Sequence, residues 1–170
     1  MMSQINNTEN DVLNVLDVMD GNENGALQYL TFELEDEHYG VEILRVQEIK
    51  GWDNVTPIPN TPSHVCGVLN LRGVIVPIID LRLLFGMTFN EYTKTTVVIV
   101  LKVQGITPRI VGVVVDAVSD AQSISADAIS VAPDLGNVVS THFIDGITNI
   151  DDRMVMLLDV DKLLSIEQVG

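Results

Sequence analysis

The sequence predicts an all-β fold built from two small, related β units that pack together. Aliphatic and β-branched runs recur along the chain between turn residues, and no amphipathic helical pattern of about 10–15 residues separates them. An internal repeat relates the two parts of the chain. The 170 residues, 46% hydrophobic and 19% charged, suffice for one domain, or two very small ones, with a substantial core.

The first predicted elements form a hairpin. Apolar and polar residues alternate over Leu27–Leu34, and the acidic turn 35–37 leads into a second strand around Tyr39. The segment 41–50 has apolar residues at three-residue spacing, which predicts a short helical or irregular crossing that ends at Gly51. Prolines then keep the next segment in an ordered loop or at a sheet edge, at positions 57, 59 and 62.

Three more pairs of strands are predicted in the rest of the chain. They are 67–80 with a turn at Arg72-Gly73, Thr95–Val103 with Arg109–Val118, and His142–Thr148 with Met154–Leu158. Asp80 and Asp159 stand where they can cap short helical turns, over 81–85 and 160–164. A further capped turn is predicted over Ser125–Ile129.

The internal repeat has two registers. At a constant shift of 79 residues, Gly67, Asn70 and Asp80 align with Gly146, Asn149 and Asp159. At a shift of 72 residues, Gly40, Val41 and Val46 match Gly112, Val113 and Val118. A unit of about 70 residues is too long for a solenoid repeat and suits two small β units. The approximate halves are 27–95 and 96–168, but strands can cross between units, so halves and units need not coincide.

The chain is strongly acidic, with a net charge of −15 and a pI near 4.2. This charge disfavours binding to nucleic acid or to anionic lipid surfaces. No apolar run reaches the ~18 residues of a membrane span, and the first ten residues lack a secretory signal pattern. The single cysteine, Cys66, excludes a disulfide framework and favours a reducing compartment, so we expect a cytoplasmic protein. Residues 1–26 are predicted to be a disordered acidic tail.

Three aspartates directly follow apolar runs, namely Asp80, Asp116 and Asp159. In open α/β sheets, catalytic carboxylates stand at such positions. The helices of such a sheet are missing, so capping or turn formation explains these residues better. The three histidines show no metal-ligand spacing with one another or with the cysteine, and no glycine-rich phosphate loop is present. We expect no cofactor, no metal and no catalysis. A small enzyme using Asp80 or Asp116 is the alternative, which a closed apolar pocket beside either would favour.

The repeat singles out one basic residue. Where the second copy has the turn Asp151-Asp152, the first has Arg72-Gly73, so a cation lies at a hairpin tip of an acidic protein. An exposed arginine that can make planar bidentate bonds is a candidate partner contact. A solvated hairpin arginine is the alternative.

Several motifs stand in order along the chain. They are Tyr39-Gly40-Val41-Glu42-Ile43-Leu44, Val46-Gln47-Glu48-Ile49, Pro59-Asn60-Thr61-Pro62, Gly67, Asn70-Leu71-Arg72-Gly73 and Val76-Pro77-Ile78-Ile79-Asp80-Leu81. Together they resemble the CheW family of bacterial chemotaxis coupling proteins, over about residues 27–166. The same module ends the chemotaxis histidine kinase CheA, but this chain is too short for a kinase or phosphotransfer domain. A free-standing coupling protein is therefore the closer likeness.

The resemblance implies two five-stranded SH3-like barrels on a shared apolar core, and a function without catalysis. The family bridges the cytoplasmic tip of chemoreceptors to the regulatory domain of the kinase CheA. We therefore expect a monomer in isolation that is recruited to receptor arrays at the membrane. An adaptor of the same type in a non-flagellar chemosensory pathway is the alternative, and the neighbouring genes would discriminate between the two.

The resemblance also assigns partner-binding residues, position by position. They are Val46, Glu48 and Arg72 near the kinase and receptor contacts, Val97 and Gly112 at positions associated with receptor coupling, and Leu135 at a second, ring-building contact with the kinase. Glu48 and Arg72 have opposite charges, and an ion pair between them would pre-organise the surface. Core filling is the alternative for Val46 and Val97, whereas the loop that contains Leu135 is expected to be exposed.

Overall fold

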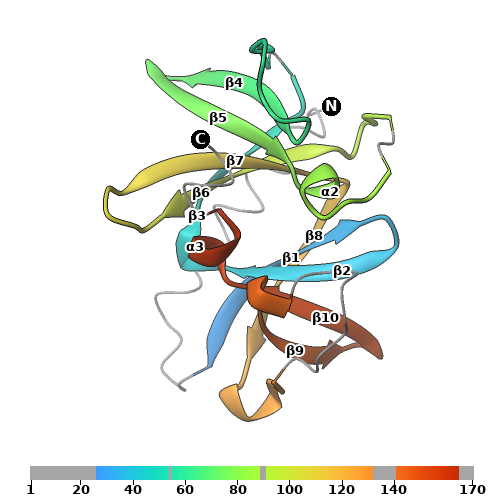
Figure 1. Cartoon of the computed structure of the whole chain (residues 1–170). Coiled ribbons are helices and arrows are strands. Elements are labelled where there is room, and N and C mark those ends of the chain that lie inside the picture. Colours follow the sequence, from blue (N-terminus) through green and yellow to red (C-terminus); the bar gives the residue numbers. More distant parts are fainter. Residues whose placement is uncertain (1–25, 54, 89–90, 132–140, 165–170) are drawn as a thin grey trace, which may run out of the picture.

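The structure is a computed structural model, and it describes residues 26–53, 55–88, 91–131 and 141–164. Within these ranges the chain forms ten strands and a few short helices (Figure 1), so the predicted all-β fold is confirmed. No helix in this part of the chain is long and apolar enough to cross a membrane. The predicted tail 1–26 lies outside the described residues, apart from Ala26.

The elements follow in chain order. The strands are β1 Leu27–Leu34, β2 Glu37–Glu42, β3 Val46–Gly51, β4 Val65–Leu71, β5 Val74–Asp80, β6 Val97–Val103, β7 Arg109–Val115, β8 Ala117–Ile124, β9 Ile144–Ile150 and β10 Arg153–Leu158. The short α-helices are α2 Leu81–Leu84 and α3 Val160–Leu163, and the 3-10 helices are η1 Ile43–Arg45, η2 Ala126–Ala128 and η3 Thr141–Phe143.

The strands form two five-stranded sheets. Sheet A has the order β8-β1-β2-β10-β9, and sheet B, above it in Figure 1, has the order β3-β6-β7-β5-β4. Strands related by the internal repeat hold the same place in the two orders, and β2–β10 and β5–β7 are parallel pairs. Each sheet takes strands from both 27–95 and 96–168, so the halves of the sequence do not coincide with the sheets.

The predicted hairpin turns and the two aspartate caps are confirmed. The β4–β5 turn, Arg72-Gly73, has φ angles of 50° and 89°, and the β9–β10 turn, Asp151-Asp152, has 52° and 63°. Two successive positive φ angles are typical of a type I′ turn, whose twist suits the flanking antiparallel strands. Asp80 and Asp159 each accept a hydrogen bond from an amide in the first turn of the helix that follows.

The segment 41–50 differs from the predicted helical or irregular crossing. Only η1 is helical, and the chain then forms strand β3, which pairs with β6. The pairing register shifts by one residue between Val46 and Glu48, which marks a β-bulge. The extra residue brings Val46 and Ile49 to buried positions although they lie three residues apart. The bulge therefore accounts for the spacing of Val46 and Ile49, whereas Ile43 lies in the 3-10 helix η1.

Strand β8 is a second difference from the prediction. The sequence predicts one strand over 109–118, whereas β7 ends before Asp116 and the chain continues as β8 at the edge of sheet A. β8 pairs with β1, and most of its residues are partly or fully exposed, so few apolar residues mark it as a strand. The 3-10 helix η2 forms within the turn predicted over Ser125–Ile129, but the side chain of Ser125 does not cap it.

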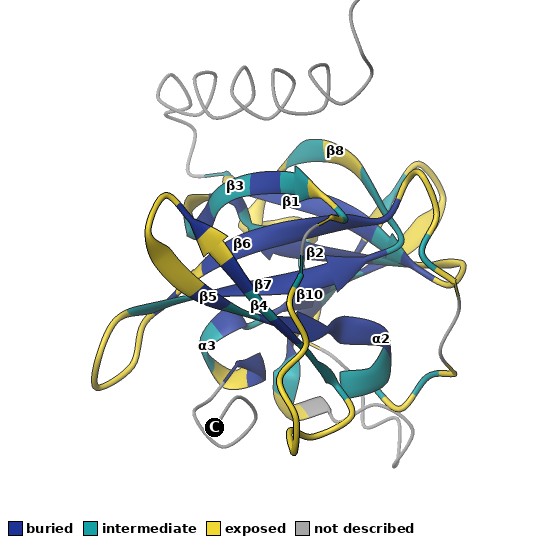
Figure 2. Ribbon diagram, turned by 90° about the horizontal axis from the view of Figure 1, so that it is seen from above, coloured by how far each residue is buried: buried dark blue, intermediate teal, exposed yellow. Residues whose placement is uncertain are grey.

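One large apolar cluster lies between the two sheets. It joins buried residues of both sheets and of α3, among them Leu30, Phe32, Ile99, Val113 and Leu163. A smaller cluster lies within each sheet. Residues of β6 and β7 alternate between the shared cluster and the cluster of sheet B, so both strands are buried over most of their length (Figure 2). The predicted shared core is therefore confirmed.

Candidate partner-binding surface

The tip of the β4–β5 hairpin presents Arg72 to solvent. Arg72 and Gly73 occupy the two positive-φ positions of the turn, and the Asn70 side chain accepts a 2.8 Å hydrogen bond from the Gly73 amide. A non-glycine residue at positive φ is uncommon, so the turn itself holds Arg72 in an unusual conformation. The side chain of Arg72 is 70% exposed. The hairpin thus fixes the point from which the guanidinium extends.

Glu48 on β3 receives this guanidinium. Arg72 Nη2 donates a hydrogen bond to Glu48 Oε2, and Lys50 Nζ lies 4.0 Å from Glu48 Oε1. The predicted pair between Glu48 and Arg72 is therefore confirmed. The hydrogen bond with Glu48 raises the pKa of Arg72 above its ordinary value. Since β3 and β4 are the two edges of sheet B, the pair helps to close this sheet, as does the backbone pairing of Thr56 with Val68.

Exposed apolar side chains follow the hairpin tip. Val74 and Ile75, the first residues of β5, are 51% and 59% exposed, and as consecutive strand residues they project from opposite faces of the hairpin. Apolar side chains beside pre-positioned charges suit protein binding, because burial of the apolar area favours association and the charges provide specificity. We call Glu48, Lys50, Arg72, Val74 and Ile75 the Glu48–Arg72 surface.

Val46 and Val97 lie in the core between the sheets. Val46 is 3% exposed and Val97 is 8% exposed, and both belong to the shared apolar cluster. These places fit the core-filling alternative, and the two side chains offer little area to a partner in this conformation. A direct contact of either residue with a partner stays a prediction.

Gly112 lies on β7 and faces the cluster within sheet B. A Cβ atom at this position would lie 2.6 Å from Cδ1 of Ile78 and 2.8 Å from Cγ1 of Val98, and both of these residues are fully buried. Glycine is therefore needed here for the close packing of neighbouring strands. A role of Gly112 in partner binding stays a prediction. The sixth predicted residue, Leu135, lies outside the described residues.

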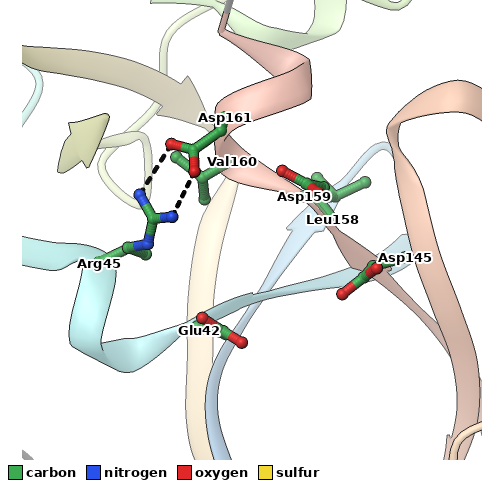
Figure 3. Close-up of a pocket in the computed structure, with 7 residues that line it drawn as sticks. All are labelled: Glu42, Arg45, Asp145, Leu158, Asp159, Val160 and Asp161. Carbon is green, nitrogen blue, oxygen red and sulfur yellow. Dashed lines mark hydrogen bonds and ion pairs between the residues drawn. The ribbon is translucent and has the colours of Figure 1, made fainter. Parts of the chain in front are cut away.

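Asp80 and Asp116 both bind the guanidinium of Arg82. Arg82 donates to the Asp80 carboxylate at 2.9 and 3.1 Å and to the Asp116 carboxylate at 2.9 Å. The side chains of Asp80 and Arg82 are fully buried, so neither is placed to act on a substrate. A polar pocket of about 170 Å³ lies near η1 and α3, and neither aspartate lines it (Figure 3). Among the described residues, no group of three or more His, Cys, Asp or Glu is arranged to hold a metal ion.

Two parts of the Glu48–Arg72 surface were missed by the sequence analysis. Lys50 lies two residues after Glu48 and hence on the same side of a strand, but the segment was interpreted as a helical or irregular crossing. Val74 and Ile75 belong to a continuous apolar run, and nothing in that run distinguishes exposed from buried residues. Both are exposed because the hairpin tip extends beyond β7, which pairs with β5 only at Ile78–Asp80.

The fold is that of a β scaffold of two five-stranded sheets, with the Glu48–Arg72 surface exposed at a hairpin tip. Residues 28–168 match the family model of the CheW-like domain. The chain is 48% identical over 143 residues to the chemotaxis protein CheW of Klebsiella aerogenes, covering 84% of each chain. It is 37% identical over 145 residues to the chemotaxis protein CheW of Rhizobium meliloti, covering 85% of this chain and 92% of that one.

The structure is similar to the crystal structure of the scaffolding protein TtCheW from Thermoanaerobacter tengcongensis. The TM-score is 0.77 at 30% sequence identity, covering 87% of this chain and 94% of that one. The chain therefore belongs to the CheW family, whose members are non-enzymatic scaffolds of chemotaxis. Its two sheets are the two SH3-like subdomains of that family, which confirms the predicted fold class. The enzyme alternative does not hold.

Proposed function

We propose that this chain couples chemoreceptors to the histidine kinase CheA in the cytoplasm, by binding both partners. The observation that carries the proposal is the Glu48–Arg72 surface, where an ion pair holds a basic hairpin tip and exposed apolar side chains follow the tip along β5. Because the chain carries a net charge of −15, a positively charged tip can be recognised by a partner through its charge. The protein then acts by coupling binding at one surface to binding at the other, and the strength of this effect is a coupling free energy.

The finer assignment follows the family resemblance. The Glu48–Arg72 surface binds the regulatory domain of CheA, and the cytoplasmic tip of the receptor binds nearby. Val46, Val97 and Gly112 support this region through packing, which agrees with their burial. Leu135 makes a second contact with the kinase, so that a protein that is a monomer in isolation joins receptor arrays. Leu135→Asp should then spare the binary affinity for the regulatory domain and reduce clustering with receptors.

The test is calorimetric titration of the chain with the purified regulatory domain of CheA and, separately, with a receptor fragment. Arg72→Glu should fold normally, because it lies on an exposed turn, and should weaken kinase binding at least tenfold. Arg153→Glu is the matched control, since it makes the same charge change at an exposed position of the equivalent β9–β10 hairpin. If Arg72→Glu leaves the affinity for the kinase domain unchanged, this surface does not contact the kinase. A wild-type chain that binds neither partner would refute the function itself.

A further inference from the structure

Two ion pairs occupy similar places in the two sheets, although Arg45 and Asp116 are one position out of register at the shift of 72 residues. Arg82 on α2 and Asp161 on α3 are related by the shift of 79, and each stands two residues after the aspartate that caps its helix. Arg82 binds Asp116, which directly precedes β8, and Asp161 binds Arg45, which directly precedes β3. β8 and β3 hold the same place in sheets A and B. The basic residue lies on the helix in one pair and on the connection in the other, so the polarity is reversed.

Each ion pair ties the helix of one sheet to a hairpin of the other. Asp116, bound to the helix that follows sheet B, accepts a 2.6 Å hydrogen bond from the Glu35 amide in the β1–β2 turn of sheet A. Asp161, on the helix that follows sheet A, accepts a 2.8 Å hydrogen bond from the Gln104 amide, directly after β6 of sheet B. Both carboxylates therefore connect the two sheets.

The two pairs differ in exposure. The side chains of Arg82 and Asp116 are 0% and 28% exposed, whereas those of Arg45 and Asp161 are 18% and 33% exposed. Two nitrogens of Arg45 bind the two carboxylate oxygens of Asp161 at 2.8 and 2.5 Å, which is a bidentate pair. Arg45 also donates to the carbonyl of Lys102 on β6 at 3.0 Å. The Arg45–Asp161 pair therefore has a defined geometry and is partly accessible to water.

The surroundings of Arg45 are acidic. Arg45 is the only basic residue among the seven that line the pocket in Figure 3, which include Glu42, Asp145 and Asp159. Its hydrogen bond with Asp161 is the main cause that raises the pKa of Arg45, and the same bond lowers the pKa of Asp161. Removal of Arg45 would leave these carboxylates without its positive charge.

We infer that the two ion pairs are clasps that fix sheet A against sheet B, and that the Arg45–Asp161 clasp positions β3 and thereby Glu48. Arg45 directly precedes β3, and Glu48 follows on the same strand just beyond the bulge. When the clasp opens, this end of β3 loses its tether to α3. The effect on partner binding rests on the proposed function, whereas the positioning of the two sheets does not.

The test uses the full chain and the variants Arg45→Ala, Asp161→Ala and the double variant, with Lys162→Ala on the same helix as the control. Residual dipolar couplings measure the orientation of one sheet relative to the other, and amide hydrogen exchange measures opening of β3. In the wild type and the control, one alignment tensor should fit both sheets. In the single variants the sheets should need separate tensors, and β3 should exchange about tenfold faster, about 1.4 kcal/mol. The double variant should match the single ones.

Two results would overturn the inference. One is a single tensor that fits both sheets of each variant, with unchanged exchange in β3. The other is exchange that rises equally in all strands while one tensor still fits, because the pair would then only stabilise the fold. Kinase binding, measured on the same samples, separates the two proposals. A wild type that fails to bind counts against the proposed function, whereas an Arg45→Ala variant whose sheets need separate tensors but which keeps full affinity counts against the link to Glu48.

Discussion

Replacement of Gly112 by alanine should destabilise the fold by about 1–2 kcal/mol. The added Cβ would lie 2.6 Å from Cδ1 of Ile78 and 2.8 Å from Cγ1 of Val98, well inside normal carbon contact distances. Both neighbours are fully buried and the branched Val98 side chain is stiff, so overpacking costs about 1–3 kcal/mol. Gly112 is not among the positive-φ glycines, so alanine fits the backbone and lowers unfolded-state entropy, which offsets about 0.4–1 kcal/mol.

Thermal unfolding followed by circular dichroism measures this effect. The midpoint should fall by about 2–8 °C, from the usual relation between free energy and Tm at this chain length. Gly51→Ala is the matched control, because Gly51 also lies in sheet B and has no atom within 4 Å of its added Cβ. An unchanged midpoint for Gly112→Ala would refute the packing argument. An unchanged midpoint together with lost kinase or receptor binding would instead show that Gly112 contacts a partner directly.

Three further outcomes are expected. Arg82→Met should destabilise the fold by about 3–5 kcal/mol in urea unfolding, because it leaves the Asp80 carboxylate buried without its counter-charge; a loss below 1 kcal/mol would contradict this account. Arg45 lowers the pKa of Asp161, so the contribution of Asp161 is present above its ordinary pKa and is lost as the pH falls through the lowered one. The difference in Tm between wild type and Asp161→Asn should therefore shrink below about pH 4, and a constant difference would argue against the pair. Burial raises the pKa of Cys66 to about 11, so a disulfide reagent at pH 8 should modify the folded chain at least about tenfold more slowly than the urea-unfolded chain. Equal rates would show that the thiol is accessible.

Features fixed by adjacent residues could be predicted from the sequence. Turn geometry depends on two residues, and the predicted turns Arg72-Gly73 and Asp151-Asp152 both formed. Helix capping depends on one side chain and the next few amides, and Asp80 and Asp159 both cap helices. The repeat and the family motifs indicated the duplicated β architecture, and opposite charges indicated the pair of Arg72 with Glu48.

Only the tertiary structure decided which face of each strand is buried and which distant residues meet. The bulge that turns the spacing of Val46 and Ile49 into a strand pattern is defined by the register with β6, and the exposed strand β8 is held by β1. The burial of Gly112 depends on side chains from β5 and β6, and the bond of Arg45 with Asp161 joins residues 116 positions apart. Turns and caps can be predicted because the groups that form them are neighbours in the sequence. Each sheet, in contrast, combines strands from both halves of the chain, so the contacts within a sheet exist only after the halves have packed together.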